Sequence, residues 1–392
     1  WLSMVISPLP PFRPTAVLLF CFILFCQPLA GKTREEIAVI IDRAENSEHD
    51  FQAKRELALM YLSGSDVPQD TLKAVKLMRS IDEWTDANKS KLSGYVPKGT
   101  ADIQRMLGEI YANGDSRVPR DLVEAVRWFR KASEYGNPQA QNNLAFCYAN
   151  GIGVAQDSVQ AATWARKSAE QGDHEGQHNL GYAYQTGQGV EKDLVLAVQW
   201  WHKAAAQGNA LSQVNLGISY ATGQGVTKDL QQAVAWYRKA AEQGNSEAER
   251  HMGFAYQMGA GVVQDMKQSA FWYRKAAEQG NEQAQHNLGF YYATGQGVSV
   301  DIAQASSWWR KASEQGYPDS ITNMGLCYLD GQGVTKDEVE AYAYFKIAGM
   351  TIAQASKELA ALEKKFSKRE IEAGEKRASE LQAQIAAKLA GK

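Results

Sequence analysis

The sequence has few cysteines, few prolines and no excess of either charge. Its 392 residues include four cysteines and ten prolines, and five of those prolines lie within the first 28 residues. Basic and acidic residues number 42 and 44 and are interleaved along the chain. Because proteins that bind nucleic acid usually carry a concentrated basic surface, this balance argues against nucleic acid as the main partner. The hydrophobic share of 44% is ordinary for a globular protein.

The first thirty residues differ from the rest. An apolar run of eleven residues, Ala16–Cys26, follows Arg13 and precedes the small residues Ala30 and Gly31. This run is shorter than the roughly 20 residues that span a bilayer, and the layout is typical of a secretory signal peptide. We expect residues 1–30 to be cleaved near Ala30 and the protein to be exported, to the periplasm or out of the cell. The alternative is an uncleaved anchor, in which case this segment would be the protein's only contact with a membrane.

The rest of the sequence repeats with a period of 36 residues. Leu180–Asp193 (LGYAYQTGQGVEKD) and Leu216–Asp229 (LGISYATGQGVTKD) match at most positions, and a degenerate copy ends at Asp70. A fixed period of 20–50 residues indicates a solenoid, propeller or array of repeats. The aspartates that close successive copies, each 36 residues after the last, are Asp121, Asp157, Asp193, Asp229, Asp265, Asp301 and Asp337.

Each repeat is predicted to be a pair of helices joined by a turn. In one copy Leu180 and Tyr184 stand four residues apart, as on one face of a helix, and strand patterns are absent from the sequence. Asp193 occupies the N-cap position of a second helix. Gly187 and Gly189 can adopt the positive φ that ends the first helix.

A tryptophan follows the closing aspartate by seven residues in six copies. Because it recurs in phase with an alanine on the same helix face, we predict that this tryptophan column forms the core. Trp201 and Trp309 lie one position further and are predicted to be partly exposed. The column consists of Trp128, Trp164, Trp200, Trp236, Trp272 and Trp308, and Tyr344 takes that place in the last copy.

These motifs resemble the Sel-one-like repeat (SLR) family, a relative of the tetratricopeptide repeats. The resemblance rests on L-G-x-x-Y, G-x-G-V-x-x-D, A-x-x-W-[WYF] and K-A-A-E-Q-G-[ND], and it covers about Phe51–Ile347. It implies an all-α fold, a right-handed α-solenoid of helix-turn-helix repeats that serves as a protein-interaction scaffold. Some secreted members of the family staple each hairpin with a disulfide. This sequence lacks those cysteine pairs, so packing between neighbouring repeats must stabilise it.

Cleavage near Ala30 would leave two cysteines, Cys147 and Cys327. Each stands one residue before the tyrosine of its helix, so the two occupy equivalent positions five repeats apart. With helices packed about 8–10 Å apart, their separation should be tens of Å, whereas a disulfide needs Cα atoms within about 7 Å. We predict that both are free and buried.

The flanks of the repeats are predicted to be capping helices. Thr33–Glu36 and Ser367–Glu370 are capping-box sequences that open amphipathic helices, and the terminal repeats of a solenoid need such polar outer faces. The predicted organisation is a signal peptide at 1–30, an N-terminal capping helix at 31–50, a degenerate first repeat plus an insertion at 51–100, seven repeats at 101–350 and C-terminal capping helices at 351–392.

One short motif has a catalytic interpretation. His174-Glu175-Gly176-Gln177-His178 matches H-E-x-x-H, in which two histidines bind Zn²⁺ and the glutamate activates water. His178 falls, however, at a position that varies from repeat to repeat. We therefore predict no metal, no cofactor and no catalytic residue, and we keep a zinc hydrolase or an enzyme acting on cell-wall material as the alternative. The G-Q-G-V loops follow helices and lack nucleotide-binding spacing, so they are predicted to be turns.

The remaining candidate is a binding groove. If tetratricopeptide geometry carries over, the first helix of each pair lines the concave face of the superhelix. Two ladders on that face, two residues before and two after the helix leucine or methionine, could bind a protein or peptide partner, although aromatics in the second ladder could equally be packing residues. We expect a non-catalytic scaffold; a purely structural spacer is a third possibility. The predicted partner-binding residues are Asn142, Phe146, His178, Tyr182, Arg250, Phe254, His286 and Phe290.

Export gives the first testable prediction. The N-terminal sequence of the mature protein, isolated from the envelope or the medium, should begin at or near Gly31, because the small residue Ala30 closes the apolar segment. A cytosolic product that retains Met4 would contradict export.

Overall fold

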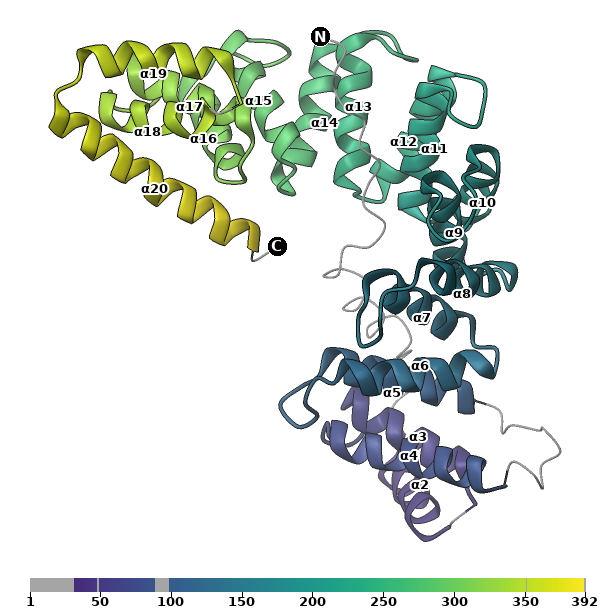
Figure 1. The fold of residues 1–392 in the computed structure, drawn as a ribbon. Coiled ribbons are helices and arrows are strands. Elements are labelled where there is room, and N and C mark those ends of the chain that lie inside the picture. Colours follow the sequence, from purple (N-terminus) through teal and green to yellow (C-terminus); the bar gives the residue numbers. More distant parts are fainter. Residues whose placement is uncertain (1–31, 48, 89–98, 350, 391–392) are drawn as a thin grey trace. The chain divides into compact units, whose positions relative to one another are not determined.

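The computed structural model describes residues 32–47, 49–88, 99–349 and 351–390. The predicted signal peptide, residues 1–30, lies outside them, and among the described residues no helix combines the length and apolar character needed to cross a membrane. The same described part contains nineteen α-helices and no strand (Figure 1). The helices are α2 (Arg34–Asn46), α3 (Phe51–Ser63), α4 (Thr71–Asn88), α5 (Thr100–Asn113), α6 (Leu122–Glu134), α7 (Pro138–Asn150), α8 (Ser158–Glu170), α9 (His174–Thr186), α10 (Leu194–Ala206), α11 (Ala210–Thr222), α12 (Leu230–Glu242), α13 (Ser246–Met258), α14 (Met266–Glu278), α15 (Glu282–Thr294), α16 (Ile302–Ser313), α17 (Pro318–Asp330), α18 (Glu338–Ala348), α19 (Ala353–Lys365) and α20 (Lys368–Ala390).

The helices from α3 to α18 form eight helix-turn-helix pairs, α3–α4 through α17–α18. Helix α2 precedes the pairs, and α19 and α20 follow them. The all-α repeat fold predicted from the 36-residue period is therefore confirmed. In each pair, the helix that comes first along the chain is called the first helix, and the other is called the second helix.

The turn inside each pair begins at a glycine that ends the first helix and finishes at an aspartate that caps the second helix. In the pair α9–α10, Gly187 has φ +77° and its N–H donates to the carbonyl of Ala183, which ends α9. The backbone N–H of Asp193 donates to the carbonyl of Tyr184 at 2.9 Å. Its carboxylate accepts from the N–H of Leu196 at 2.9 Å and so caps α10. The predicted turn and N-cap are both present.

The second glycine of the turn lets one repeat touch the repeat before it. Gly189 has φ +73°, and a Cβ there would lie 1.9 Å from the carbonyl oxygen of Ser158, at the start of α8. In a later copy, a Cβ at Gly261 would lie 2.1 Å from the carbonyl oxygen of Leu230, at the start of α12. Any other residue would be strained in φ and would also push the repeats apart. The G-Q-G-V loops are turns, as predicted, and they also pack between repeats.

The core of most pairs is an aromatic ring laid against a glycine. Gly181 on α9 faces Trp201 on α10, and a Cβ at this glycine would lie 2.6 Å from the indole ring. Gly253 on α13 faces Tyr273 on α14 at the same distance. The glycine of L-G-x-x-Y is therefore the residue that allows the two helices to approach. The same contact is made by Gly108 with Phe129, Gly217 with Tyr237, Gly289 with Trp309 and Gly325 with Phe345.

This contact corrects the predicted role of the tryptophans. Trp201, expected to be partly exposed, is only 1% exposed, whereas Trp309 is half-buried as predicted. In the column predicted to be core, Trp128 is buried but the other five tryptophans are half-buried. A lysine three residues on covers them: Lys203 Nζ lies 3.8 Å from the ring centroid of Trp200. The core position is eight residues after the aspartate, because only that side chain meets the glycine.

The first repeat departs most from the others. Helix α4 has 18 residues, so the start of the segment predicted to be an insertion is helical, and residues 89–98 lie outside the described part. Asp82 on this extension is buried and accepts from Gln104 Nε2 at 2.6 Å and from Lys131 Nζ at 2.8 Å. These contacts tie α4 to the pair that follows.

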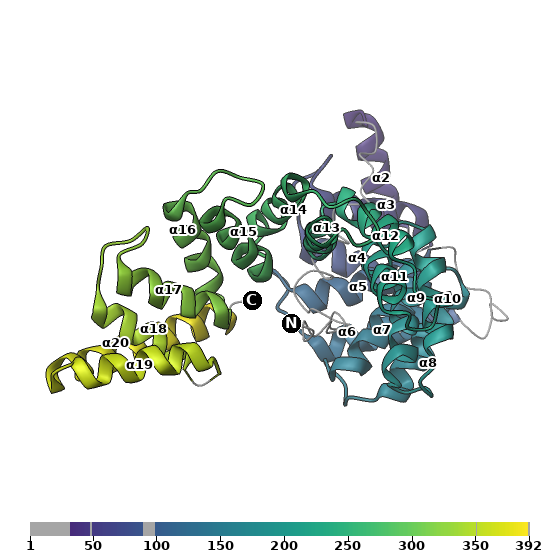
Figure 2. The same ribbon diagram turned by 90° about the horizontal axis from the view of Figure 1, so that it is seen from above.

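The chain divides into two compact units, Trp1–Asn209 and Ala210–Lys392. In the first unit a buried cluster that includes Leu57, Met78 and Leu107 joins α3, α4 and α5. In the second unit, Figure 2 shows α15–α18 following one another in a row with α19 and α20 at its end. There Phe345 of α18 shares a cluster with Leu362 of α19 and with buried residues of α20.

Both predicted capping boxes are present. The N–H of Thr33 donates to the Glu36 carboxylate at 2.8 Å, and the N–H of Ser367 donates to the Glu370 carboxylate at 2.7 Å. In each box the glutamate N–H donates back to the hydroxyl. Helices α2 and α20 therefore begin where the sequence predicts.

The contact between glycine and ring predicts a dependence of one substitution on another. Gly253→Ala should destabilise the second unit. The substitution raises helix propensity by about 1 kcal/mol, but crowding the packed core against Tyr273 costs about 1–3 kcal/mol, and the cost outweighs the gain. In a Tyr273→Ala background, itself weaker by roughly 3–5 kcal/mol, Gly253→Ala should instead stabilise, since the added methyl then meets no ring. Urea unfolding of the four proteins measures both effects. Equal effects of Gly253→Ala in the two backgrounds would contradict this packing.

Candidate functional site

The two helices of a pair are joined by a side-chain amide contact that recurs along the chain, and we call these contacts the amide ladder. In the first unit, Gln171 Nε2 donates to Gln141 Oε1 at 2.8 Å and Gln207 Nε2 donates to Gln177 Oε1 at 2.9 Å. The glutamine of the A-E-Q-G motif, which directly follows the second helix, thus bonds to the first helix of its own pair, 30 residues earlier. In the second unit the same contact joins Gln243 to Gln213, Gln279 to Glu249 and Gln315 to Gln285.

A second recurring contact pairs an arginine with the tyrosine of L-G-x-x-Y. Arg130 Nη2 donates to the Tyr148 hydroxyl at 3.0 Å, and Arg274 Nη2 donates to the Tyr292 hydroxyl at 2.9 Å. The two residues of each pair are 18 apart and belong to successive repeats. These polar side chains are therefore engaged in joining repeats. The other pairs are Arg166 with Tyr184, Arg238 with Tyr256 and Arg310 with Tyr328.

In the first unit, the predicted partner-binding residues are largely covered. Asn142, Phe146, His178 and Tyr182 are all buried. Asn142 accepts at its Oδ1 from Asn179 Nδ2 of the next first helix, at 2.7 Å. The ladder in this unit thus includes a contact between repeats, and Tyr182 also lines a cavity.

In the second unit, the predicted residues are more accessible. Phe290 on α15 is 43% exposed, and Arg250, Phe254 and His286 are half-buried. Arg250 Nε donates to the Glu247 carboxylate at 3.0 Å. His286 Nδ1 lies 2.9 Å from the Ser320 hydroxyl, and burial lowers the pKa of its imidazole. This unit therefore offers a mixed apolar and polar surface on its first helices.

The H-E-x-x-H motif is split between surface and interior. His174 is at the exposed start of α9, and Asn209 Nδ2 lies 3.2 Å from Glu175 Oε1 and 3.3 Å from His174 Nδ1. His178, one turn on, is 5% exposed, and burial lowers its pKa to about 4. Among the described residues no three potential ligands of the His, Cys, Asp and Glu type gather in one place.

The two remaining cysteines are free and buried, as predicted. Burial raises the pKa of Cys147 to about 12 and that of Cys327 to about 11. Both thiols are protonated at neutral pH and serve as small packing residues.

Helix α13 carries titratable residues where other first helices carry amides. Glu249 replaces the ladder glutamine and His251 replaces an asparagine, and both are buried. Burial raises the pKa of Glu249 and holds that of His251 well below its usual range, with Arg250 adding to the second shift. His251 stacks on the Tyr237 ring at 4.5 Å. Glu249 is thus the one titratable side chain in the described amide ladder.

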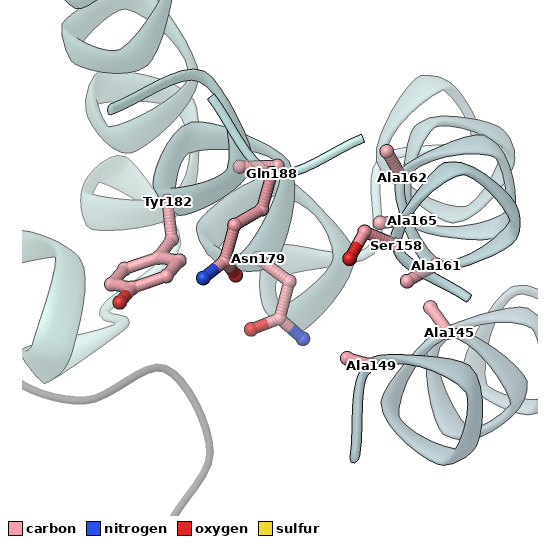
Figure 3. A pocket seen from close by; sticks show the side chains of 10 residues that line it. Ala145, Ala149, Ser158, Ala161, Ala162, Ala165, Asn179, Tyr182 and Gln188 are labelled. Atoms are coloured by element: carbon pink, nitrogen blue, oxygen red, sulfur yellow. The ribbon is translucent and has the colours of Figure 1, made fainter. Parts of the chain in front are cut away.

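A cavity lies between α7, α8 and α9, within the first unit. Its alanines come from all three helices, Asn179 and Tyr182 line it on α9, and Ser158 and Gln188 lie at exposed positions (Figure 3). We call it the alanine cavity, and its volume is about 20 Å³. It was not predicted, although the sequence carries a signal for it: this copy alone has alanine both at the glycine of L-G-x-x-Y and at the aromatic position. The alanines are Ala145, Ala149, Ala161, Ala162, Ala165 and Ala183.

The recurring contacts agree with a comparison of the sequence with known families. The sequence profile of the Sel1 repeat matches eight segments that together cover well over half of the chain. The chain belongs to the Sel1 repeat family. The resemblance inferred from the motifs is thus confirmed, and the Sel1 repeats form a scaffold of the kind that binds proteins. The matched segments are residues 52–80, 101–137, 138–173, 174–209, 210–245, 246–281, 282–317 and 318–350.

Two solved structures show the same repeats over most of the chain. A Sel1 repeat protein from Oxalobacter formigenes is 29% identical, with a TM-score of 0.61 over 85% of this chain and 91% of that one. A protective antigen of uropathogenic Escherichia coli with an SLR fold is 27% identical, with a TM-score of 0.53 over 90% and 96%. A search of curated protein sequences gives no match.

Burial of a histidine inside a Sel1 repeat predicts a loss of stability in acid. The pKa of His178 is about 4 when folded and about 6.5 when unfolded, so the unfolded state binds the proton more tightly. Its contribution to the free energy of unfolding is fully present above pH 6.5 and should fall by ~2 kcal/mol between pH 7 and pH 5. His178→Asn, which copies Asn142 of the previous repeat, should remove that part of the pH dependence.

The exposed neighbour provides the control for this test. His174→Asn should retain the loss of stability between pH 7 and pH 5, because His178 is still buried in that variant. Identical pH profiles for the wild type and His178→Asn would mean that His178 is not held neutral in the fold.

Proposed function

We propose that this Sel1 repeat protein is an exported, non-catalytic scaffold that binds a protein or peptide on the exposed face of its first helices. The observation that carries the proposal is Phe290, an aromatic side chain that is 43% exposed on a first helix. Aromatic residues at such positions are enriched among the residues that dominate binding energy.

Variation among the repeats supports a recognition role for this face. The positions that hold the helices and repeats together carry nearly the same residue in each copy: glycine, glutamine, arginine and tyrosine. The position of Arg250 and His286 instead holds asparagine, histidine, valine, arginine and histidine in five successive copies. A scaffold with constant joints and changing surface residues can present a specific surface without changing its fold.

The non-catalytic part of the proposal rests on where the titratable side chains lie. The two histidines of H-E-x-x-H lie in different environments, since His174 is exposed and His178 is interior. Glu175 accepts from Asn209. One equivalent of tightly held zinc that is lost in His178→Asn would contradict this part.

Export is supported by the apolar segment Ala16–Cys26 ahead of Ala30. The similarity to a protective antigen of uropathogenic E. coli is in keeping with it. A soluble-peptide or envelope-protein partner would be met in that compartment.

The binding face is tested by peptide selection on the purified protein. Peptides from a displayed random library should be enriched, and Phe290→Ala should weaken their binding by about thirtyfold or more, as for a hot-spot residue. Its melting temperature should change little, because much of the side chain is already in solvent. Phe271→Ala is the matched control, since Phe271 is 48% exposed but lies on a second helix, α14.

Two results would count against the proposed face. Selection that enriches no peptide would contradict a peptide-binding role. Peptides that lose affinity with Phe271→Ala but not with Phe290→Ala would place the binding surface on the second helices.

A further inference from the structure

We propose that the alanine cavity receives the aromatic side chain of a tyrosine from a bound peptide. The inference rests on the proposed function, because it names the ligand chemistry at Tyr182, a residue of that same predicted surface. The observation behind it is the difference between the repeat α7–α8 and the repeat α13–α14, three copies further along the chain.

The cavity lies where this repeat lacks side chains that fill the same place in the pair α13–α14. Three repeats separate the two places, so equivalent residues differ by 108 in number. Ala165 on α8 corresponds to Tyr273 on α14, and Ala183 on α9 corresponds to Tyr291 on α15. Three other cavity positions also carry smaller side chains: Ala149 stands for Gln257, Ala161 for Ser269 and Ser158 for Met266.

In the second unit, the equivalent side chains form a closed aromatic cluster. The rings of Tyr273 and Tyr291 meet edge to face at 5.6 Å, and both are fully buried. The Tyr273 hydroxyl donates to Gln257 Oε1 at 2.8 Å, and the Tyr291 hydroxyl lies 2.7 Å from the Ser269 hydroxyl. The space between the two helices of a pair and the first helix of the next pair is therefore suited to phenol rings whose hydroxyls meet neutral polar groups.

The lining of the alanine cavity keeps that chemistry without the rings. Its floor is methyl groups, and its polar groups are the neutral side chains of Ser158, Asn179 and Gln188 (Figure 3). Because no charged side chain lines it, an uncharged occupant is favoured over a lysine or a carboxylate. An aromatic ring with one hydroxyl matches both the apolar floor and the polar mouth.

The size of the cavity sets how the ring enters. A volume of about 20 Å³ accepts the leading edge of a ring rather than the whole of it. The rest of the ring would lie at the exposed side of the lining, at Ser158 and Gln188. The occupant must therefore be presented from outside, as a side chain of a peptide on this surface is.

The probe for the test is 4-methylphenol, the side chain of tyrosine, with cyclohexanol as the non-aromatic control. In two-dimensional NMR of the full chain, 4-methylphenol should shift the amide signals of Ala145, Ala161 and Ala183 with a Kd on the order of 1 mM, as expected for a ligand of this size. Cyclohexanol should bind at least fivefold more weakly. Equal binding of the two probes, or no shift at these alanines, would overturn the inference.

A variant that closes the cavity with the chain's own ring separates binding from folding. Ala145→Gly with Ala165→Tyr recreates the glycine and ring of the pair α13–α14 and should fold, while the affinity for 4-methylphenol falls at least tenfold. Ala161→Leu, at the half-buried mouth, is the second variant if the first fails to fold, and it should weaken binding in the same direction. Unchanged affinity in a folded variant of either kind would overturn the inference.

The peptides selected on the whole protein distinguish this inference from the proposed function. They should contain a tyrosine or phenylalanine whose replacement by alanine weakens binding in the wild type but not in the Ala145→Gly/Ala165→Tyr protein. Peptides that bind both proteins equally would overturn the cavity while leaving the proposed function intact. Binding of 4-methylphenol at the cavity, with no peptide enriched, would instead remove the proposed function alone.

Discussion

The contact between a ring on the second helix and a glycine on the first sets the spacing of the two helices in every repeat that has it. A Cβ at that glycine would lie 2.4–2.6 Å from the ring in the pairs from α9–α10 to α17–α18. Each ring therefore occupies the space that a side chain would need. The contact of the second loop glycine with the preceding repeat is separate from the ring contact, since a Cβ at Gly153, in the pair α7–α8, would also lie 2.1 Å from the carbonyl oxygen of Leu122. The amide ladder joins the two helices of a pair, and the arginine–tyrosine pairs join successive repeats.

The repeat α7–α8 shows what happens when this contact is lost on both sides at once. Alanine at position 145 would collide with a ring, and alanine at position 165 removes the ring, so the two changes are sterically matched. The helices of this repeat keep their lengths and caps, because those depend on Asn137, Asp157 and Gly151 rather than on the ring. The alanine cavity lies at this place. A repeat array can in this way acquire a cavity without altering its backbone.

The features that could be predicted from the sequence are those with a local cause. An aspartate that caps a helix and a glycine with positive φ act within a few residues, so the turn and the cap at Gly187 and Asp193 could be predicted from the residues around them. The choice between Trp200 and Trp201 as the core residue could not be made, because both positions recur every 36 residues and only the glycine on another helix separates them. The burial of His178, the contact between the glutamines of a pair and the alanine cavity likewise depend on neighbours 20–40 residues away. The candidate surface was predicted as eight residues in two ladders. Its accessible part lies mainly at Arg250, Phe254, His286 and Phe290.

The recurring hydrogen bonds between helices link residues only 18 or 30 positions apart, and this has a consequence for how the chain folds. A protein whose contacts are this close in sequence has a low contact order, so little loop entropy must be overcome before native contacts form. Each repeat can order on its neighbour as soon as both have been synthesised, and the array can grow from any well-packed pair. The same arrangement lets a weak repeat open while the others remain folded. An array of this kind responds to force or to a chaperone one repeat at a time, with its weakest joint opening first.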